Sequence, residues 1–209
     1  KYLTGFIYLM NKGERTRNEI LKQSIKHASR FGLADITIGT VSKLCQLSRT
    51  GVISHFKNKE DMQIAILNYG EELFIERVIR PSWREDPLDH LAAFLDSCMN
   101  WTIEMFDEYQ VSCPFIKAVA EFQNRPDSEV RAFTIVQQNR LVSYITRRVQ
   151  RCFEHGRFTS DTDSETIAYE LYSLYLGHAL TKHTVSASRS DDMFKKCVAR
   201  LLKRYQTPD

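Results

Sequence analysis

The stretch "TIGTVSKLCQLSRTGVISHFKNKEDM", residues 37–62, contains two short apolar patterns separated by a very short connection. Apolar side chains recur at helical spacing over residues 38–45, and Thr37 stands directly before them as a candidate N-cap. Ser48 is the corresponding candidate cap of a second helix over residues 49–55. Two short helices joined so tightly predict a helix-turn-helix, a unit too short and too polar to be a core on its own.

Small hydroxyl and cationic side chains occupy many of the other positions of this stretch. The second helix of such a motif enters the major groove of DNA, where short side chains let the backbone approach and Arg49 can reach base edges. Hydroxyls at helix N-termini suit phosphate oxygens. The residues expected to contact DNA are Thr37, Lys43, Ser48, Arg49, Thr50, Ser54, His55, Lys57 and Lys59.

Charge is distributed unevenly along the chain. Residues 1–60 contain 11 Lys and Arg against 4 Asp and Glu, whereas the remaining residues contain 18 against 22, within a net charge of +3. A basic N-terminal part on a mildly acidic body favours contact between that part and a polyanion.

The remainder of the chain predicts long helices. Hydrophobic residues make up 43% of the 209 positions, and Gly (8) and Pro (5) are scarce, which argues against a turn-rich β fold. We find no β-alternation and no internal repeat. The expected fold is all-α with about nine helices, over residues 15–31, 38–45, 49–55, 59–79, 87–108, 113–125, 127–156, 163–187 and 190–205.

A longer run around the motif carries a family resemblance. The sequence "TRNEILKQSIKHASRFGLADITIGTVSKLCQLSRTGVISHFKNKEDM", residues 16–62, opens on Thr-Arg, has a Phe-Gly turn and closes on His-Phe before Lys-Glu. It resembles the DNA-binding domain of the TetR/AcrR family of transcriptional regulators. The positions that match in kind are Thr16, Arg17, Ile20, Leu21, Gly32, Thr37, Ile38, Val41, Ser48, His55, Phe56, Lys59, Glu60 and Met62.

Three positions depart from the family pattern. Gln46 stands where the family prefers the turn Gly, so a left-handed residue there would cost on the order of 1 kcal/mol. Thr50 replaces a usual Gly and adds a group that can contact a base, whereas Ile53 replaces a Tyr whose hydroxyl meets a phosphate in the family. The roles implied by the resemblance are therefore carried over most firmly to Thr37, Ser48, Arg49, His55 and Lys59.

The resemblance implies two functional parts. Residues 10–57 are expected to form the helix-turn-helix DNA-binding domain and residues 58–209 a helical effector-binding and dimerisation domain, after an extension at residues 1–9. Aromatic and Met side chains of the second part are expected to line an effector pocket, although the same residues would serve equally as core. The pocket candidates are Trp101, Met105, Phe106, Phe115, Phe122, Tyr144, Tyr169 and Tyr172.

The segment over residues 168–185 is the candidate dimer contact. It is rich in Tyr and Leu and contains small residues that would let a symmetry mate approach closely. Burial of its apolar side chains inside one subunit is the competing interpretation. The interface candidates are Tyr175, Gly177, Ala179 and Leu201.

The expected function is that of a sequence-specific DNA-binding transcriptional regulator. We expect a homodimeric repressor that is released from a palindromic operator in double-stranded DNA by a small-molecule effector of unknown identity. Five cysteines without a paired spacing predict reduced thiols in a cytoplasmic protein, with no metal site, no cofactor and no membrane span. An architectural DNA-binding protein without an effector is one alternative.

An enzyme is the other alternative. Cys113 precedes Pro114 at an expected helix N-terminus, a position that can lower a thiol pKa and make it responsive to oxidants or electrophiles. The sequence has no nucleophile motif, Gly-rich phosphate loop or metal-spaced cluster, so we expect a structural thiol and no enzymatic activity. The histidines that such an enzyme would use are His90, His155, His178 and His183.

Overall fold

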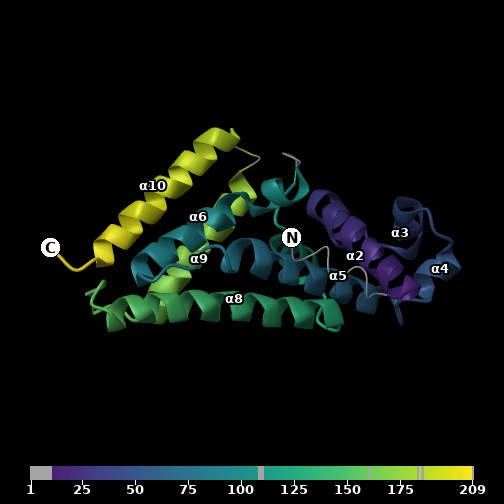
Figure 1. The fold of residues 1–209 in the computed structure, drawn as a ribbon, viewed down its shortest axis with the longest axis horizontal. Helices are drawn as coiled ribbons and strands as arrows, with labels where there is room; N and C mark the ends of the chain where they lie inside the picture. The colour runs from purple at the N-terminus through teal and green to yellow at the C-terminus, as the bar shows by residue number, and fades with distance from the viewer. Residues whose placement is uncertain (1–10, 108–110, 160, 183, 185, 209) are drawn as a thin grey trace.

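The fold is entirely helical in the part of the chain that the structure describes, which confirms the predicted all-α class (Figure 1). The computed structural model describes residues 11–107, 111–159, 161–182, 184 and 186–208, so the expected extension at residues 1–9 and His183 lie outside it. Its helices are α2 (Lys12–Phe31), α3 (Ile38–Cys45), α4 (Arg49–Ile53), α5 (Lys59–Phe74), the π-helix η2 (Ile75–Ile79), α6 (Pro87–Phe106), α7 (Pro114–Phe122), α8 (Glu129–Glu154), α9 (Ser164–Thr181) and α10 (Ala187–Tyr205).

Side-chain caps determine where the short N-terminal helices begin. Thr37 and Ser48 each accept a hydrogen bond from the backbone N–H three residues later, at 3.0 Å, as predicted. Asn58 caps α5 in the same way at 2.8 Å. Each cap satisfies an N–H group that has no partner within its own helix, so α3, α4 and α5 each start at the residue after it.

The helix predicted over residues 59–79 changes character before its end. α5 stops at Phe74, and η2 continues from it with a wider turn, closed by a 2.9 Å hydrogen bond from the Arg80 N–H to the Ile75 carbonyl. Apolar periodicity does not reveal this change, because a π-helical turn inserts only a single residue. α9 likewise ends at Thr181 and not at residue 187.

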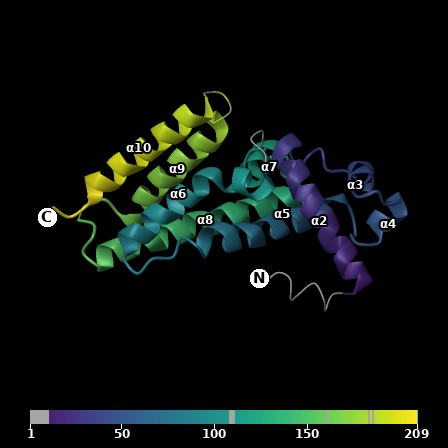
Figure 2. The ribbon, with the colours of Figure 1, turned by 45° about the horizontal axis from the view of Figure 1, so that its top comes forward.

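The helices form an elongated molecule with the helix-turn-helix at one end (Figure 1). α5 packs against both α2 and α8, and so connects that end to the body of the molecule. α8 also contacts α6, α7 and α9, which makes it the central helix of the larger part. α10 packs along α9 on the side away from the helix-turn-helix (Figure 2).

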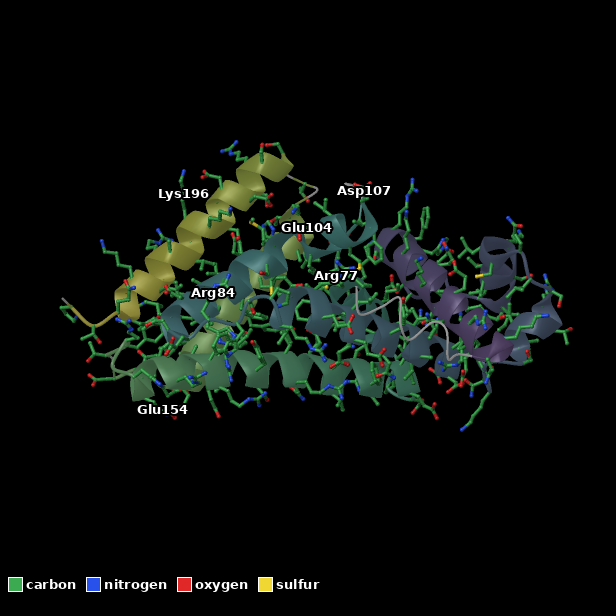
Figure 3. All side chains as sticks on the ribbon, in the orientation of Figure 1. Arg77, Arg84, Glu104, Asp107, Glu154 and Lys196 are labelled. Atoms are coloured by element: carbon green, nitrogen blue, oxygen red, sulfur yellow. The ribbon has the colours of Figure 1, made fainter. Side chains whose placement is uncertain are left out.

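Apolar side chains fill the interior and charged side chains surround it. Fully buried side chains include Ile25, Leu67 and Phe94, whereas charged side chains such as Glu154 and Lys196 project from the outside of α8 and α10 (Figure 3). Within the described ranges, no helix is both long and apolar enough to cross a membrane.

The helix-turn-helix is joined to the body by contacts between α2 and α7. Glu121 of α7 accepts a 2.8 Å hydrogen bond from the backbone N–H of Ala34, and Lys117 donates one of 2.8 Å to the carbonyl of Arg30. Gly32, between these points, has φ +95°, and a Cβ atom there would lie 1.8 Å from a Glu121 carboxylate oxygen. The backbone conformation therefore favours glycine, and a side chain there would also displace the Glu121 carboxylate.

Candidate nucleic-acid interface and interior cavity

The turn between α3 and α4 fixes the angle at which the two helices meet. Gln46 adopts a left-handed conformation, with φ 54° and ψ 39°, as the family pattern predicts for this position. Ser42 Oγ donates a 2.6 Å hydrogen bond across the turn to the Leu47 carbonyl. Val41 and Val52 are fully buried, one from each helix. The small Ser42 and the two Val side chains thus form the tight helix crossing that the sequence predicts.

The nine predicted DNA-contacting residues lie within or next to α3 and α4 and around the start of α5, at the end of the molecule formed by the helix-turn-helix (Figure 1). His55 is half-buried and the other eight are exposed. The structure therefore brings the predicted residues to one end of the molecule and leaves most of their side chains in solvent. They are Thr37, Lys43, Ser48, Arg49, Thr50, Ser54, His55, Lys57 and Lys59.

The two capping hydroxyls differ in their capacity to donate to a phosphate. Thr40 Oγ1 donates its only proton to the Asp35 carbonyl at 3.0 Å, so the 2.9 Å contact between Thr37 Oγ1 and Thr40 Oγ1 uses the proton of Thr37. Ser48 Oγ accepts the Gly51 N–H, and its proton has no acceptor among the described residues. Ser48 is therefore the better phosphate donor in this conformation.

Arg49 is placed to extend from the first turn of α4. Its side chain is exposed, and one guanidinium nitrogen lies 3.9 Å from where a Cβ atom of Gly39 would be. No salt bridge holds it among the residues that the structure describes. It is thus free to turn toward a base edge.

Two exposed apolar side chains on this surface were missing from the predicted set. Ile53 on α4 is 54% exposed and Leu44 on α3 is 37% exposed. Apolar side chains on a DNA-facing surface can contact thymine methyl groups. The replacement of Tyr by Ile at position 53 was the available sequence signal, whereas Leu44 belonged to an apolar pattern that indicated burial.

His55 and Phe56 follow the end of α4, and Phe56 contacts Arg17 of α2. The Phe56 ring is buried, and the guanidinium of Arg17 lies 5.2 Å from its centre, in a cation–π contact. The His55 ring contacts the edge of Phe56, with 6.4 Å between the ring centres. These contacts orient His55, which is the least exposed of the nine predicted residues.

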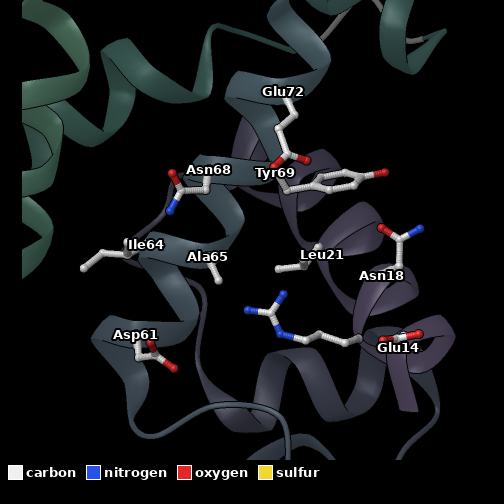
Figure 4. Close-up of a pocket in the computed structure, with 10 residues that line it drawn as sticks. Glu14, Asn18, Leu21, Asp61, Ile64, Ala65, Asn68, Tyr69 and Glu72 are labelled. Carbon is white, nitrogen blue, oxygen red and sulfur yellow. The ribbon is translucent and has the colours of Figure 1, made fainter. Parts of the chain in front are cut away.

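A polar groove of about 360 Å³ lies between α2 and α5, behind the helix-turn-helix (Figure 4). Glu14 and Asn18 line it from α2, and Asp61, Asn68 and Glu72 line it from α5. Its carboxylates make it unlike the apolar effector pocket that the sequence predicts, and none of the pocket candidates lies in it.

An apolar cavity of about 200 Å³ lies deeper in the body, between α5, η2, α7, α8 and α9. Two of the predicted pocket residues, Phe115 and Tyr144, line it. The full set of lining residues is Glu71, Phe74, Ile75, Ile79, Cys113, Phe115, Ile116, Gln137, Gln138, Arg140, Leu141, Tyr144, Arg147 and Tyr175.

The other pocket candidates lie at varying distances from this cavity. Trp101 stacks on Phe115 with 5.5 Å between the ring centres, and Tyr172 donates a 2.7 Å hydrogen bond to the lining residue Gln138. Met105, Phe106 and Phe122 pack in the core without reaching the cavity. Tyr169, at 67% exposed, is on the outer face of α9, which corrects its predicted place in the pocket.

The predicted dimer residues separate between the interior and the surface. Tyr175 is 4% exposed and lines the cavity, which corrects its predicted place on the surface. Gly177 is exposed, and a Cβ atom there would meet nothing within 4 Å. Ala179 and Leu201 are half-buried. α9 has apolar side chains on opposite sides. A shift of one residue along the sequence therefore decides whether a tyrosine faces the interior or the surface.

The outer face of α9 and α10 is partly apolar. Tyr169 and Leu180 of α9 and Met193 of α10 are each more than half exposed. A shallow groove between the two helices is lined by Tyr169, Glu170, Ser173, Leu174, Cys197, Arg200, Leu201 and Arg204.

Cys113 does not have the surroundings of a reactive thiol. It is buried, and burial raises the pKa of its thiol even though Tyr175 donates a 3.4 Å hydrogen bond to its sulfur. The protonated form is therefore favoured, in contrast to the lowered pKa that its helix N-terminal position suggests. Across the described ranges no group of three or more His, Cys, Asp or Glu side chains could hold a metal ion.

Known proteins share this architecture. A family sequence profile described as "Tetracyclin repressor-like, C-terminal domain" matches residues 87–196. A TetR-family transcriptional regulator from Cytophaga hutchinsonii superposes with a TM-score of 0.79 at 18% identity, covering 96% of this chain and 99% of that chain. A TetR-family transcriptional regulator from Streptomyces coelicolor has a TM-score of 0.77 at 16% identity, with 93% and 97% covered. AibR in complex with isovaleryl coenzyme A and operator DNA has a TM-score of 0.63 at 18% identity, with 86% and 96% covered.

No curated protein sequence matched the chain. The profile nevertheless covers more than half of the 209 residues, and the solved structures share the arrangement of a helix-turn-helix end and a larger helical body. The matched proteins are transcriptional regulators and not enzymes, in agreement with the predicted absence of enzymatic activity. The chain belongs to the TetR family of transcriptional regulators.

Proposed function

We propose that the protein is a homodimeric repressor that binds a palindromic operator and is released from it by a small-molecule effector. Residues 10–57 would bind DNA, and residues 58–209 would bind the effector and the second subunit. The observation that carries this proposal is the exposure of the basic and hydroxyl side chains of α3, α4 and the start of α5 on one end of the molecule.

The apolar cavity supports the effector part of the proposal. Two of the helices that border it, α5 and α7, also pack against α2 of the helix-turn-helix part. AibR, which has the same fold, has been solved with both isovaleryl coenzyme A and operator DNA. A DNA-binding end and a ligand-binding body are therefore compatible in one chain of this architecture.

The apolar outer face of α9 and α10 supports the dimer. An isologous contact across this face would bury Tyr169, Leu180 and Met193, which a monomer leaves in water. It would also hold two α4 helices in one molecule. A palindromic operator with half-sites about 34–36 Å apart would then be read by both subunits.

The DNA-binding part is tested by selecting bound duplexes from a randomised library and measuring affinity for the selected sequence by fluorescence anisotropy. We expect a palindrome, with affinity falling steeply between about 50 and 200 mM salt. Arg49→Ala should weaken binding by about ten- to a hundredfold if the guanidinium contacts a base. Arg77→Ala is the matched control, because Arg77 is exposed on η2, away from the helix-turn-helix.

Two results would contradict the proposal. Equal affinity for selected and random duplexes would favour the architectural alternative, and an Arg49→Ala protein that binds like Arg77→Ala would remove α4 from the interface. The dimer is tested separately by sedimentation equilibrium of Gly177→Arg, at an exposed position where an added Cβ atom meets nothing within 4 Å in its own subunit. We expect this variant to be a folded monomer that binds the palindrome weakly, and an unchanged dimer would exclude this face.

A further inference from the structure

We propose that the effector is a small aromatic or otherwise apolar carboxylic acid with a hydroxyl group at the end opposite its carboxylate. This inference rests on the proposed effector function and specifies the chemistry of that same cavity. It follows from the size of the cavity, from one buried acceptor in its wall and from the uncompensated positive charge at its side.

The walls and size of the cavity favour a small aromatic body. Phe74, Phe115 and Tyr144 line it, and Phe74 meets Phe115 edge to face with 6.2 Å between the ring centres. Ile75 and Ile79, the two ends of η2, also face it, and π-helical turns are frequent at functional sites. The volume of about 200 Å³ is below the roughly 300 Å³ at which drug-sized sites begin. One ring with a short chain is therefore the expected scale.

A buried acceptor in the wall calls for a hydrogen-bond donor on the ligand. Gln137 is 4% exposed, and its amide nitrogen points to two acceptors, the Leu67 carbonyl at 3.4 Å and a Glu71 oxygen at 3.2 Å. That surrounding fixes the orientation of the amide, because the opposite orientation would place oxygen against oxygen. Gln137 Oε1 is left buried with no partner. The cavity does not reach that oxygen in this conformation, so the wall must move for a ligand hydroxyl to donate its proton to Oε1 and satisfy it.

The charges around the cavity leave a net positive side. Glu71 is neutralised by Arg140, which donates to both of its carboxylate oxygens at 2.9 and 2.7 Å. Arg147 also lines the cavity, is exposed to solvent, and has no salt-bridge or hydrogen-bond partner among the described residues. The Arg148 guanidinium lies 5.1 Å from the centre of the Tyr144 ring, and its Nε is buried without a partner. A ligand carboxylate beside Tyr144 would meet the Arg147 guanidinium, whereas Arg148 does not line the cavity and adds only positive charge nearby.

The acceptor and the cations are at opposite ends of the lining surface of α8. Gln137 and Arg147 are ten residues apart on that helix, or about 15 Å along its axis. Both side chains lean toward the N-terminus of α8, and the longer Arg147 side chain leans back farther than that of Gln137, which shortens the span between their polar groups. The hydroxyl and the carboxylate should therefore be at the two ends of the ligand.

The test measures ligand binding by calorimetry on the whole protein without DNA. The probes are 4-hydroxybenzoate, 4-hydroxyphenylacetate and 3-(4-hydroxyphenyl)propanoate, which differ in the distance between the hydroxyl and the carboxylate. Each is compared with the acid that lacks the hydroxyl and with the alcohol that replaces the carboxylate. We expect one hydroxy acid to bind at least about tenfold more tightly than both of its truncated partners, because an unmade buried hydrogen bond carries a penalty of that order.

Three variants and one control assign the two groups. Gln137→Met keeps the length of the side chain, and it should abolish the preference for the hydroxyl while preserving the preference for the carboxylate. Gln137→Glu restores an acceptor and should recover part of the hydroxyl preference. Arg147→Gln should abolish the preference for the carboxylate while preserving the preference for the hydroxyl. Arg77→Gln, which changes an exposed cation on η2 that does not line the cavity, should leave both preferences unchanged. Thermal unfolding of each variant confirms that it is folded.

Several results would overturn this inference. Equal binding of hydroxylated and unhydroxylated acids would exclude the role of Gln137, and equal binding of acid and alcohol would exclude that of Arg147. Failure of every probe to bind the folded protein would exclude the class. Operator affinity is measured separately: a probe that binds without releasing DNA would contradict the proposed release mechanism, but not the ligand chemistry. Absence of operator binding without ligand would contradict the proposed function alone.

Discussion

Replacing Gln46 by Gly should stabilise the protein, although most substitutions by glycine destabilise. Gln46 ends α3 with φ 54°, and its side chain is exposed, so no packing is lost when the side chain is removed. A left-handed conformation costs a residue with a Cβ atom about 1–2 kcal/mol, and glycine avoids this cost. Glycine also gives the unfolded chain more freedom, which offsets about 0.5–1 kcal/mol of the gain. The expected net increase in the free energy of unfolding is about 0.5–1 kcal/mol.

The measurement is urea unfolding followed by circular dichroism, at one protein concentration because the proposed dimerisation would add to apparent stability. Gln150→Gly is the matched control, since Gln150 is exposed within regular helix α8. The control should lose about 0.5–1 kcal/mol, because glycine is a poor helix former. The two identical substitutions should therefore have opposite signs. Equal destabilisation by both would show that the turn at position 46 is not strained and would refute the reasoning.

Three further predictions concern single side chains. Gly32→Ala should lower the free energy of unfolding, measured by chemical denaturation, by more than about 2 kcal/mol, because φ at this position is positive and the new Cβ atom would clash with Glu121. The loss should be smaller when the same substitution is made in a Glu121→Ala protein. The hydrogen bond from the backbone N–H of Asp89 is the main cause that lowers the pKa of the Asp86 carboxyl in the folded protein. The ionised carboxylate therefore stabilises the fold at pH values above the unfolded pKa of about 3.9, and this stabilisation is lost as the pH falls through the lower folded pKa. Asp86→Asn should therefore be less stable than the parent at pH 7, and the difference should vanish in acid. The Cys113 thiol should react with maleimide only after unfolding, as judged by peptide mass mapping, because burial raises its pKa.

The helix-turn-helix could be predicted closely because its signals are local. A capping hydroxyl lies within three residues of the N–H group that it satisfies, so Thr37 and Ser48 could be identified as caps from their neighbours alone. The left-handed residue at position 46 was predicted from the family pattern in the same way. Exposure was harder to predict: Leu44 fits the apolar pattern of α3 but is 37% exposed.

The cavity could be predicted only in part, because it exists where five helical elements meet. Phe115 and Tyr144 line it, but an aromatic residue looks the same in sequence whether it faces a cavity or a packed neighbour. Gln137 was not predicted at all. Its importance depends on the Leu67 carbonyl and Glu71, which are some 70 residues distant in sequence and orient its amide. No local pattern carries that information.

The cavity and the DNA-binding end share α7, and this limits how an effector can act. Phe115 and Ile116 of α7 line the cavity, and Glu121 on the same helix binds the backbone N–H of Ala34, three residues before the cap of α3. A ligand that fits both states of the protein equally would not change operator affinity, however tightly it bound. Moving the protein from almost fully DNA-competent to almost fully released needs about 5.5 kcal/mol of preference for one state. One buried hydrogen bond to Gln137 contributes about 1–3 kcal/mol, so it cannot be sufficient alone. Under the proposed mechanism the carboxylate and the apolar body would therefore also have to distinguish the two states, and the walls formed by η2 and α7 would change shape when the ligand binds.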